Sequence, residues 1–532
     1  MHIRVVSHRL VKASDPSLNK PRVDAVSNLD LDPNSIQGSV TCVYPKPAKG
    51  GDFNGVVAAF EAHFPTLLNH FYPLTGRIVF DPSSPMIPEL HCHNQGAELI
   101  VADAGVPLCS LDWGSSEESL KRIQLPYAEE IPLSVQLISF TCGGFAVVWS
   151  GNNLMGDGNM GMNLVKMWSE LVRSGGTSFT GQAPNHDRSL FRPRDPPSYR
   201  ASIEGLFTSS SEGGMVNALT AEQSFIERLY YIEASDIARL RHMASTASRA
   251  QAVSAYLWKV FAAVVGSSKL LAESDKRCRM LWWVDGRRVL APELRSKLGN
   301  YAGNVVAYAV READVETILE KPLPELAMMV RETIASIDGE HIQGLVDWIE
   351  VHKPHKFIET PIVGLGSPTL GQTMWSSFPT DTDFGFGHAS LALPVDSRGR
   401  LCAGVLCIGQ RPGDSGSWVL SAYIWPRLAA ALEADKERIF KPLTPEYLGF
   451  TPATANCKGI PEYKDPTEVA HREHVLSISP GSSMPKDRMN LSRSSWTLLT
   501  AKEGAEPASP DPATRGGPDL ASNPHKHAEL RV

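Results

Sequence analysis

Apolar positions change their spacing along the first part of the chain, and the spacing predicts which segments form strands and which form helices. SVTCVYPKP (39–47) and FAVVWSGN (145–152) are rich in β-branched and aromatic residues, which indicates strands. Apolar residues recur at helical spacing in residues 53–71 and 160–175, which predicts two amphipathic helices. The second helix runs into two glycines, a common stop signal.

The same alternation of helix and strand patterns returns in the second half of the chain. Residues 252–266 have a helix pattern, residues 281–286 a strand pattern, and residues 421–439 the pattern of a closing helix. The passage between the halves is polar and rich in Pro, Gly and Ser, which predicts a crossover linker. We therefore predict an α/β fold with an N-terminal domain (1–195), a linker (196–215), a C-terminal domain (216–452) and a disordered polar tail (453–532).

Composition narrows the classes of protein that fit. A chain of 532 residues is too long for one hydrophobic core, which agrees with two large domains. The net charge of −7 gives no electrostatic reason to expect nucleic acid or an anionic membrane as partner. The N-terminus lacks the apolar core of a signal peptide, and no apolar run reaches the ~20 residues of a membrane helix. The eight scattered cysteines form no CxxC pair, so we expect neither a disulfide framework nor structural zinc, in a cytoplasmic protein.

Two short motifs suggest other chemistry but lack the residues that this chemistry needs. GDSGS (413–417) resembles the nucleophile segment of a trypsin-like protease, yet no matching histidine segment precedes it, so a turn before a strand is favoured. HCH (91–93) would place His91 and His93 on one face of a strand, where both could bind a metal. No third ligand follows at a suitable spacing, so we expect two ordinary strand histidines and no metal site.

Five segments, in order along the chain, resemble the plant-type BAHD acyltransferases, a family of two-domain enzymes that use acyl-coenzyme A. The segments are FYPLTGRI (71–78), CGGFAVVWSGNNLMGDG (142–158), VSAYLWK (253–259), VDGRRVLAPEL…GNYAGNVV (284–306) and DFGFG (383–387). They are similar to the family's YPLAGR segment, the strand and loop of its HxxxDG motif, its SAxxWR helix, its RxR…GN segment and its DFGWG motif. The resemblance spans roughly residues 1–445.

The most important departure from the family is at the position of its general base. In the family the histidine of HxxxDG takes a proton from the acceptor hydroxyl or amine; here that position is Asn153. An asparagine amide donates and accepts hydrogen bonds but has no protonation change near neutral pH. His388, which directly follows DFGFG, is a possible substitute base.

The other motif residues have expected roles that the resemblance supplies. Asp157 is expected to point away from the substrate and to pair with an arginine of the second domain, for which Arg287 is our candidate. Phe386 stands where the family has tryptophan, and it lacks the indole N–H that could donate to an oxyanion. Because that loop lies away from the reacting atoms in the family, we expect Phe386 to be a packing residue.

The resemblance also implies an architecture and ligands. It implies two similar-sized mixed-sheet αβ domains, similar to chloramphenicol acetyltransferase, with a tunnel between them and Asn153 at its middle. Acyl-coenzyme A would be a cosubstrate, with no permanently bound cofactor and no metal. Candidate coenzyme-binding residues are Ser254, Gly303 and Asn304, and candidate structural motif residues are Gly158, Asp383, Gly385 and Gly387. We expect a monomer that binds a small-molecule acceptor and neither binds nucleic acid nor inserts into a membrane.

Three hypotheses about function follow. The first is transfer of an acyl group, other than an aminoacyl group, from an acyl-CoA thioester to a hydroxyl or amine in specialised metabolism, with an altered motif. The second is a catalytically inactive relative that binds acyl thioesters or a partner enzyme, which Asn153 and Phe386 favour. The third is a peptide-bond-forming condensation domain, but no carrier or adenylation module accompanies it in 532 residues.

Overall fold

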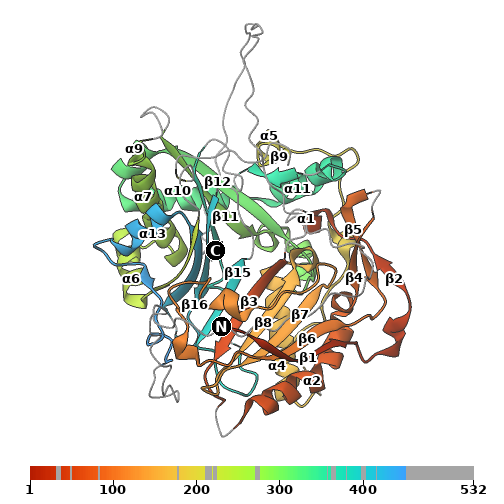
Figure 1. The fold of residues 1–532 in the computed structure, drawn as a ribbon. Coiled ribbons are helices and arrows are strands. Elements are labelled where there is room, and N and C mark those ends of the chain that lie inside the picture. Colours follow the sequence, from red (N-terminus) through yellow and green to blue (C-terminus); the bar gives the residue numbers. More distant parts are fainter. Residues whose placement is uncertain are drawn as a thin grey trace, which may run out of the picture. The chain divides into compact units, whose positions relative to one another are not determined.

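A computed structural model describes most of the chain outside its last eighty or so residues (Figure 1). The described residues are 1–31, 37–47, 51–81, 84–176, 179–209, 219, 225–269, 276–355, 357–360, 367–378, 380, 382–396, 403–414 and 416–450. All of them belong to one unit of mutually contacting elements. The predicted tail (453–532) lies outside the described residues.

The first sheet has six strands, five of them from the N-terminal part of the chain (Figure 1). In spatial order they are β1 (Arg4–Val11), β6 (Ala97–Asp103), β7 (Leu133–Ser139), β8 (Phe145–Asn152), β3 (Gln37–Tyr44) and β15 (Leu391–Asp396). β8 coincides with the predicted strand 145–152, and β3 covers residues 39–44 of the predicted strand 39–47. The two strands run antiparallel with Gln37 opposite Asn152. This register brings the start of β3 beside the loop that follows β8.

Helices α2 (Phe53–His70) and α4 (Gly158–Arg173) lie on one face of this sheet and agree closely with the two predicted helices. Their apolar faces carry large aromatic rings. The rings of Phe64 and Trp168 stack with their centroids 4.2 Å apart, and Trp168 also meets Trp149 of β8 edge-on at 5.3 Å. Such packing stabilises the layer that the helices and the sheet form together.

The second sheet has seven strands and comes from the C-terminal half. In spatial order they are β12 (Val306–Asp314), β11 (Arg277–Asp285), β14 (Thr369–Met374), β16 (Ala403–Gln410), β17 (Trp418–Ile424), β10 (Ile226–Ile232) and β18 (Lys441–Pro442). Helix α7 (Arg249–Gly266) packs against it, and a capping box between Ser248 and Gln251 sets its start. The predicted helix 252–266 and strand 281–286 are thus both present, each extended toward its N-terminal side.

Shorter elements complete the structure. A small three-stranded sheet contains β2 (Arg22–Asp24), β5 (Ser84–Cys92) and β4 (Arg77–Asp81). A two-stranded sheet contains β9 (Phe207–Ser209) and β13 (Phe357–Glu359). The other α-helices among the described residues are α1 (Asn28–Leu31), α3 (Leu120–Ile123), α5 (Ala201–Glu204), α6 (Ala234–Met243), α8 (Pro292–Leu298), α9 (Val315–Glu320), α10 (Leu323–Ala335), α11 (Gly339–His352) and α13 (Pro426–Glu433).

The predicted closing helix at residues 421–439 is wrong over its first part. Residues 418–424 form β17, in which Trp418, Val419 and Leu420 are buried, and the helix begins only at Pro426. Proline lacks a backbone N–H and favours the first turn of a helix, so it marks the start of α13 rather than its interior. The turn predicted at GDSGS does precede this strand, and Asp414 Oδ1 accepts hydrogen bonds from the backbone N–H groups of Gly416 and Ser417.

The two sheets confirm the predicted mixed α/β class with two sheet-rich halves. They do not divide the chain at a single point, because β15 of the second half pairs with β3 and forms the edge of the first sheet. The boundaries predicted at residues 195 and 216 therefore stay predictions.

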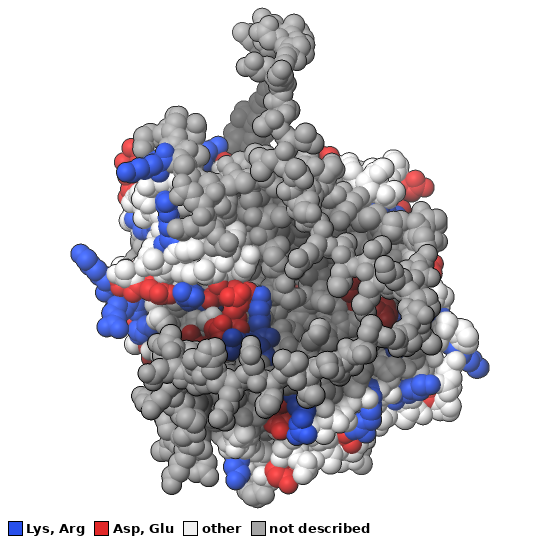
Figure 2. Space-filling model, in the orientation of Figure 1, with Lys and Arg blue, Asp and Glu red and all other residues white. Residues whose placement is uncertain are grey.

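The described residues also bear on the expectations drawn from composition. None of the described helices is long and apolar enough to cross a membrane. Within the described ranges no group of three or more His, Cys, Asp and Glu side chains could hold a metal, and His91 instead contacts Glu89 at 2.9 Å. Of the described cysteines, five are free and Cys109 is disulfide-bonded, so the expectation of a reduced setting holds for all of these but Cys109. On the face shown in Figure 2, described acidic and basic side chains are intermixed.

The partly buried His186 predicts how stability depends on pH. Its Nε2 donates to the carbonyl oxygen of His70 at 2.8 Å, and burial lowers the pKa of His186 to about 4 although this hydrogen bond opposes the shift. The unfolded chain therefore binds a proton here at a higher pH than the folded chain does. We expect this residue's contribution, of about 3 kcal/mol, to be present above pH 6.5 and lost as the pH falls toward 4.

Denaturant unfolding at pH 7, 5.5 and 4.5 checks this expectation. His186→Gln should reduce the loss of unfolding free energy between pH 7 and 4.5. The same substitution at the exposed His388 should leave that loss as it is in the unmodified protein. Equal pH dependence in all three proteins would contradict the assignment.

Candidate active site

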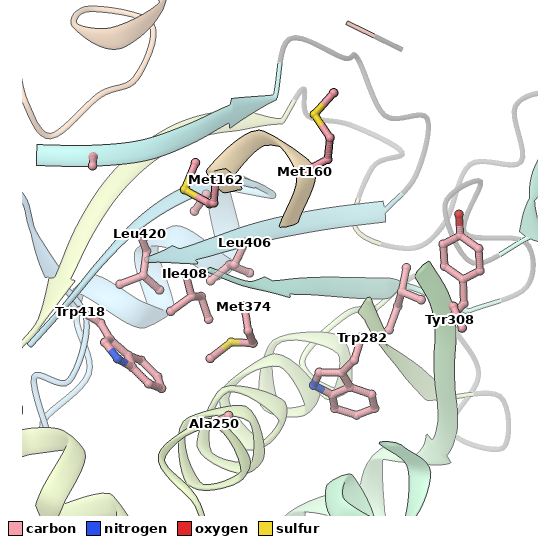
Figure 3. Packing of buried hydrophobic residues seen from close by; sticks show 14 of the residues in the cluster. Met160, Met162, Ala250, Trp282, Tyr308, Met374, Leu406, Ile408, Trp418 and Leu420 are labelled. Atoms are coloured by element: carbon pink, nitrogen blue, oxygen red, sulfur yellow. The ribbon is translucent and has the colours of Figure 1, made fainter. Parts of the chain in front are cut away.

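A cavity of about 280 Å³ lies between the two sheets and is lined by residues of both. Strands β3, β8 and β15 and helix α4 line it from the first sheet, and strands β11, β12, β14 and β16 line it from the second. Much of the wall is apolar. Met160 and Met162 of α4 line it, and they belong to a buried cluster that continues behind the wall to Leu406 and Ile408 of β16 (Figure 3). A largely apolar cavity with a few polar groups is the usual form of a small-molecule site.

Asn153 lies on this cavity wall, in a short 3-10 turn (Asn153–Met155) between β8 and α4. The side chain of Asn152 starts the turn by accepting a hydrogen bond from the backbone N–H of Leu154 at 2.9 Å. Asn304 Nδ2 donates to the backbone carbonyl of Asn153 at 2.7 Å. The side-chain amide of Asn153 makes no hydrogen bond to any described residue, so both its donor and its acceptor are available to a ligand.

Asp157 forms an ion pair with Arg287, as the resemblance led us to expect. Arg287 Nη1 lies 2.7 Å from Asp157 Oδ2, and Nη2 lies 3.2 Å from Oδ1. The side chain of Arg287 is only 6% exposed and that of Asp157 only 8%. Burial opposes the charge on Arg287, but the neighbouring Asp157 outweighs it and raises the pKa of the guanidinium.

Both side chains of this ion pair also form hydrogen bonds with backbone groups. Asp157 caps α4, since its Oδ1 accepts from the N–H groups of Asn159 and Met160, and its Oδ2 accepts from the N–H of Val305 at 3.0 Å. Arg287 also donates to the carbonyl oxygen of Gly303 at 3.0 Å. A carboxylate with these partners is not available as a proton acceptor, so Asp157 holds the loop in place and joins it to the second sheet.

A second buried ion pair, which the sequence did not reveal, holds the loop from its other side. Asp30 is fully buried, and its Oδ2 lies 3.0 Å from Arg188 Nη1. Asp30 Oδ1 accepts from both the backbone N–H of Asn304, at 2.9 Å, and its Nδ2, at 3.0 Å. Arg188 Nη2 donates to the carbonyl of Met155 at 3.3 Å. Asp30 and Arg188 are 158 positions apart, and no local pattern predicts their pairing.

The three candidate coenzyme-binding residues lie in different surroundings. Asn304 lines the cavity. Gly303 does not, but it is tightly enclosed, because a side chain there would collide with the Arg188 guanidinium and the Tyr301 ring. Ser254 is 1% exposed and outside the cavity wall; its hydroxyl donates to Gln372 Oε1 at 2.8 Å and accepts from Trp282 Nε1 at 3.2 Å.

The DFGFG segment lies away from the cavity wall. Asp383 Oδ1 accepts hydrogen bonds from the backbone N–H groups of Gly385 at 2.6 Å and Gly387 at 3.2 Å. Both glycines have positive φ, which suits them to this tight loop. The ring of Phe386 packs beside Phe60 and Phe145, with centroid distances of 6.5 and 6.3 Å. These surroundings agree with a packing role for Phe386.

Two further motif residues differ in their access to the cavity. Gly158 lines it, and a Cβ atom there would lie 2.8 Å from the ring of Trp375. His388, the possible substitute base, is exposed and is not among the residues that line the cavity. It is therefore in no position to replace a base at Asn153.

The cavity wall carries few ionisable groups. Of the described residues that line it, only Asp157, Tyr308 and Cys407 have ionisable side chains, and none is a histidine or lysine. Its polar groups are otherwise neutral amides, hydroxyls and backbone atoms, among aromatic and sulfur-containing side chains. Such a wall favours binding of an uncharged, partly aromatic molecule.

Comparison with known proteins gives one family and several relatives. The model of the Transferase family matches residues 1–438. Omega-hydroxypalmitate O-feruloyl transferase of Arabidopsis thaliana is 27% identical over 73% of this chain and 85% of that protein. Fatty alcohol:caffeoyl-CoA acyltransferase of the same plant is 27% identical over 62% of this chain and 75% of that protein. Anthranilate N-benzoyltransferase protein 1 of Dianthus caryophyllus is 26% identical over 73% of this chain and 89% of that protein.

Solved structures share the fold. Vinorine synthase has a TM-score of 0.63 and 21% identity, covering 83% of this chain and 99% of that one. F. graminearum TRI101 complexed with ethyl coenzyme A has a TM-score of 0.66 and 15% identity, covering 79% and 99%. At these identities the likeness concerns the arrangement of the two sheets.

The buried ion pair predicts a large loss of stability when one partner is removed. Arg287→Met leaves the Asp157 carboxylate buried without its counter-charge, so we expect the free energy of unfolding to fall by about 3–5 kcal/mol. Denaturant unfolding followed by tryptophan fluorescence measures this. Arg4→Met is the matched control, because its pair with Asp103 is solvent-exposed and should contribute little. Similar small effects in both variants would contradict a stabilising role for the buried Asp157–Arg287 pair.

Proposed function

The chain belongs to the Transferase family, the BAHD acyltransferases, and we propose that it transfers an acyl group from acyl-CoA to a hydroxyl or amine of a small molecule in specialised metabolism. The observation that carries this proposal is the unused side-chain amide of Asn153 on the wall of an apolar cavity, in a loop fixed by two buried ion pairs. An ordered loop with a free polar group is what a positioning catalyst needs.

The proposed mechanism relies on positioning more than on proton transfer. General base catalysis contributes about 10²–10⁴ in rate, and this chain does without it at Asn153. Holding two reactants in line supplies roughly 7–11 kcal/mol by itself, and a thioester is already an activated donor. Asn153 would then hydrogen-bond either the attacking atom or the oxyanion that forms at the thioester carbonyl. A single oxyanion donor contributes about 10²–10³ in rate.

We propose an aromatic acyl group as the donor. Trp149, Trp283, Trp375 and Tyr308 line the cavity, and aromatic side chains favour aromatic ligands. The names of the two plant relatives from Arabidopsis thaliana point the same way, since they specify feruloyl and caffeoyl transfer for those proteins. Of the candidate coenzyme-binding residues, we assign direct contact to Asn304 and supporting roles to Gly303 and Ser254. A monomer in the cytoplasm remains our proposal for its state and location.

One observation favours a second function. Because the described cavity wall holds no histidine, the protein could bind acyl-CoA or a partner enzyme without catalysing transfer. The two buried ion pairs would then preserve a binding site and nothing more. The two functions differ in one measurable property, the release of free coenzyme A.

Release of coenzyme A thiol, with a panel of acyl-CoA donors and of alcohol and amine acceptors, tests the proposal. We expect turnover by the unmodified protein and a loss of about 10² in kcat for Asn153→Ala, which removes the hydrogen-bonding group. Asn153→His should raise the rate with alcohols by about 10²–10⁴, because it supplies a base. Asn54→His is the matched control, since it makes the same change on the exposed surface of α2.

The outcomes separate the two functions. No release of coenzyme A by the unmodified protein, together with release by Asn153→His, would favour the accessory function over catalysis. No release by either protein, together with acyl-CoA binding in calorimetry, would favour a binding protein. Absence of both binding and turnover would overturn both functions.

A further inference from the structure

We propose that the acceptor is an amine that is uncharged at neutral pH, of the aryl amine class, rather than an alcohol or an alkyl amine. This inference rests on the proposed acyl transfer and names the acceptor class for the same cavity. It follows from two properties of the described cavity wall: which groups could accept a proton from the acceptor, and which could balance a positive charge on it.

The first step concerns proton acceptors. An alcohol must lose its proton as it attacks, and a nearby base has to take that proton. Asp157 is engaged by Arg287, two backbone N–H groups of α4 and the N–H of Val305. The other ionisable side chains on the described wall are the phenol of Tyr308 and the thiol of Cys407. The described wall thus offers neither an imidazole nor a carboxylate free of an arginine as the base.

The second step concerns charge. An alkyl amine is an ammonium ion at neutral pH, as the lysine side chain is. Moving it into the cavity without a counter-charge is costly. Of the described residues on the wall, Asp157 alone carries a carboxylate, and Arg287 already neutralises it. The cavity therefore disfavours an ammonium ion.

An aryl amine avoids both difficulties. Its lone pair is delocalised into the ring, so the nitrogen is uncharged at neutral pH and still nucleophilic toward a thioester. Its ring suits a wall that contains Trp149, Trp283 and Trp375. The open amide of Asn153 would accept a hydrogen bond from the amine N–H through Oδ1 and so orient the lone pair toward the carbonyl carbon.

The step is balanced without a protein base. The nitrogen lone pair attacks the thioester carbonyl carbon, and a C–N bond forms. The tetrahedral intermediate collapses with cleavage of the C–S bond, and the bonding electrons leave with sulfur. The departing thiolate takes the proton that nitrogen loses, which gives an amide and the free thiol of coenzyme A.

Three acceptors of similar size test the inference on the unmodified protein: aniline, benzylamine and benzyl alcohol, each with the same aromatic acyl-CoA. We expect kcat/KM for aniline to exceed that of the other two at least tenfold at pH 7. We also expect kcat/KM for aniline to change less than threefold between pH 6 and 7.5, because aniline stays uncharged there and the described wall holds no histidine. His388→Asn should leave this profile unchanged, since that residue is exposed.

Each other outcome counts against the inference. Faster turnover of benzyl alcohol or benzylamine overturns the acceptor class and leaves the proposed acyl transfer standing. A profile for aniline that rises with a midpoint near pH 7 reveals a protein base and also overturns it. Silence with all three acceptors, and with the wider panel of alcohols and amines, overturns both this inference and the proposed transfer.

Discussion

The buried ion pair between Asp157 and Arg287 is the interaction on which the site depends. Asp157 opens α4 beside the first sheet, and Arg287 follows β11 of the second, so one pair of side chains connects the two halves. Each charge lies out of water and is tolerable only while the other is within hydrogen-bond distance. The pair therefore fixes the spacing between the Asn153 loop and the strands that close the cavity.

A second buried assembly gives that loop its orientation. Asp30 binds Arg188 and Asn304, and these two reach the carbonyl oxygens of Met155 and Asn153. The backbone of the turn is thus hydrogen-bonded on the protein side, while the Asn153 amide stays free on the cavity side. Fixing the backbone in this way leaves the identity of one side chain to decide what chemistry the cavity supports.

The same ion pairs determine the electrostatics of the cavity. Both buried carboxylates are paired with arginines within hydrogen-bond distance, and of the two only Asp157 lines the cavity, so the described wall presents no uncompensated negative charge. What remains on the wall is aromatic, sulfur-containing or neutral and polar. The structure thus combines precise positioning with an absence of acid–base groups on its described wall, and this combination favours reactants that need little proton transfer.

The sequence by itself determined several of the central elements and the identity of the residue at the loop. Helices α2, α4 and α7 and strands β3, β8 and β11 follow from spacing within a few residues, as does the substitution at Asn153. The boundary between β17 and α13 was missed because a continuous apolar run fits both periods until Pro426 interrupts it. Only the tertiary structure decided that Asp30 meets Arg188, that β15 joins the first sheet, and that Ser254 and His388 lie off the cavity wall. These contacts join residues far apart in the chain, and the local spacing of side chains cannot predict them.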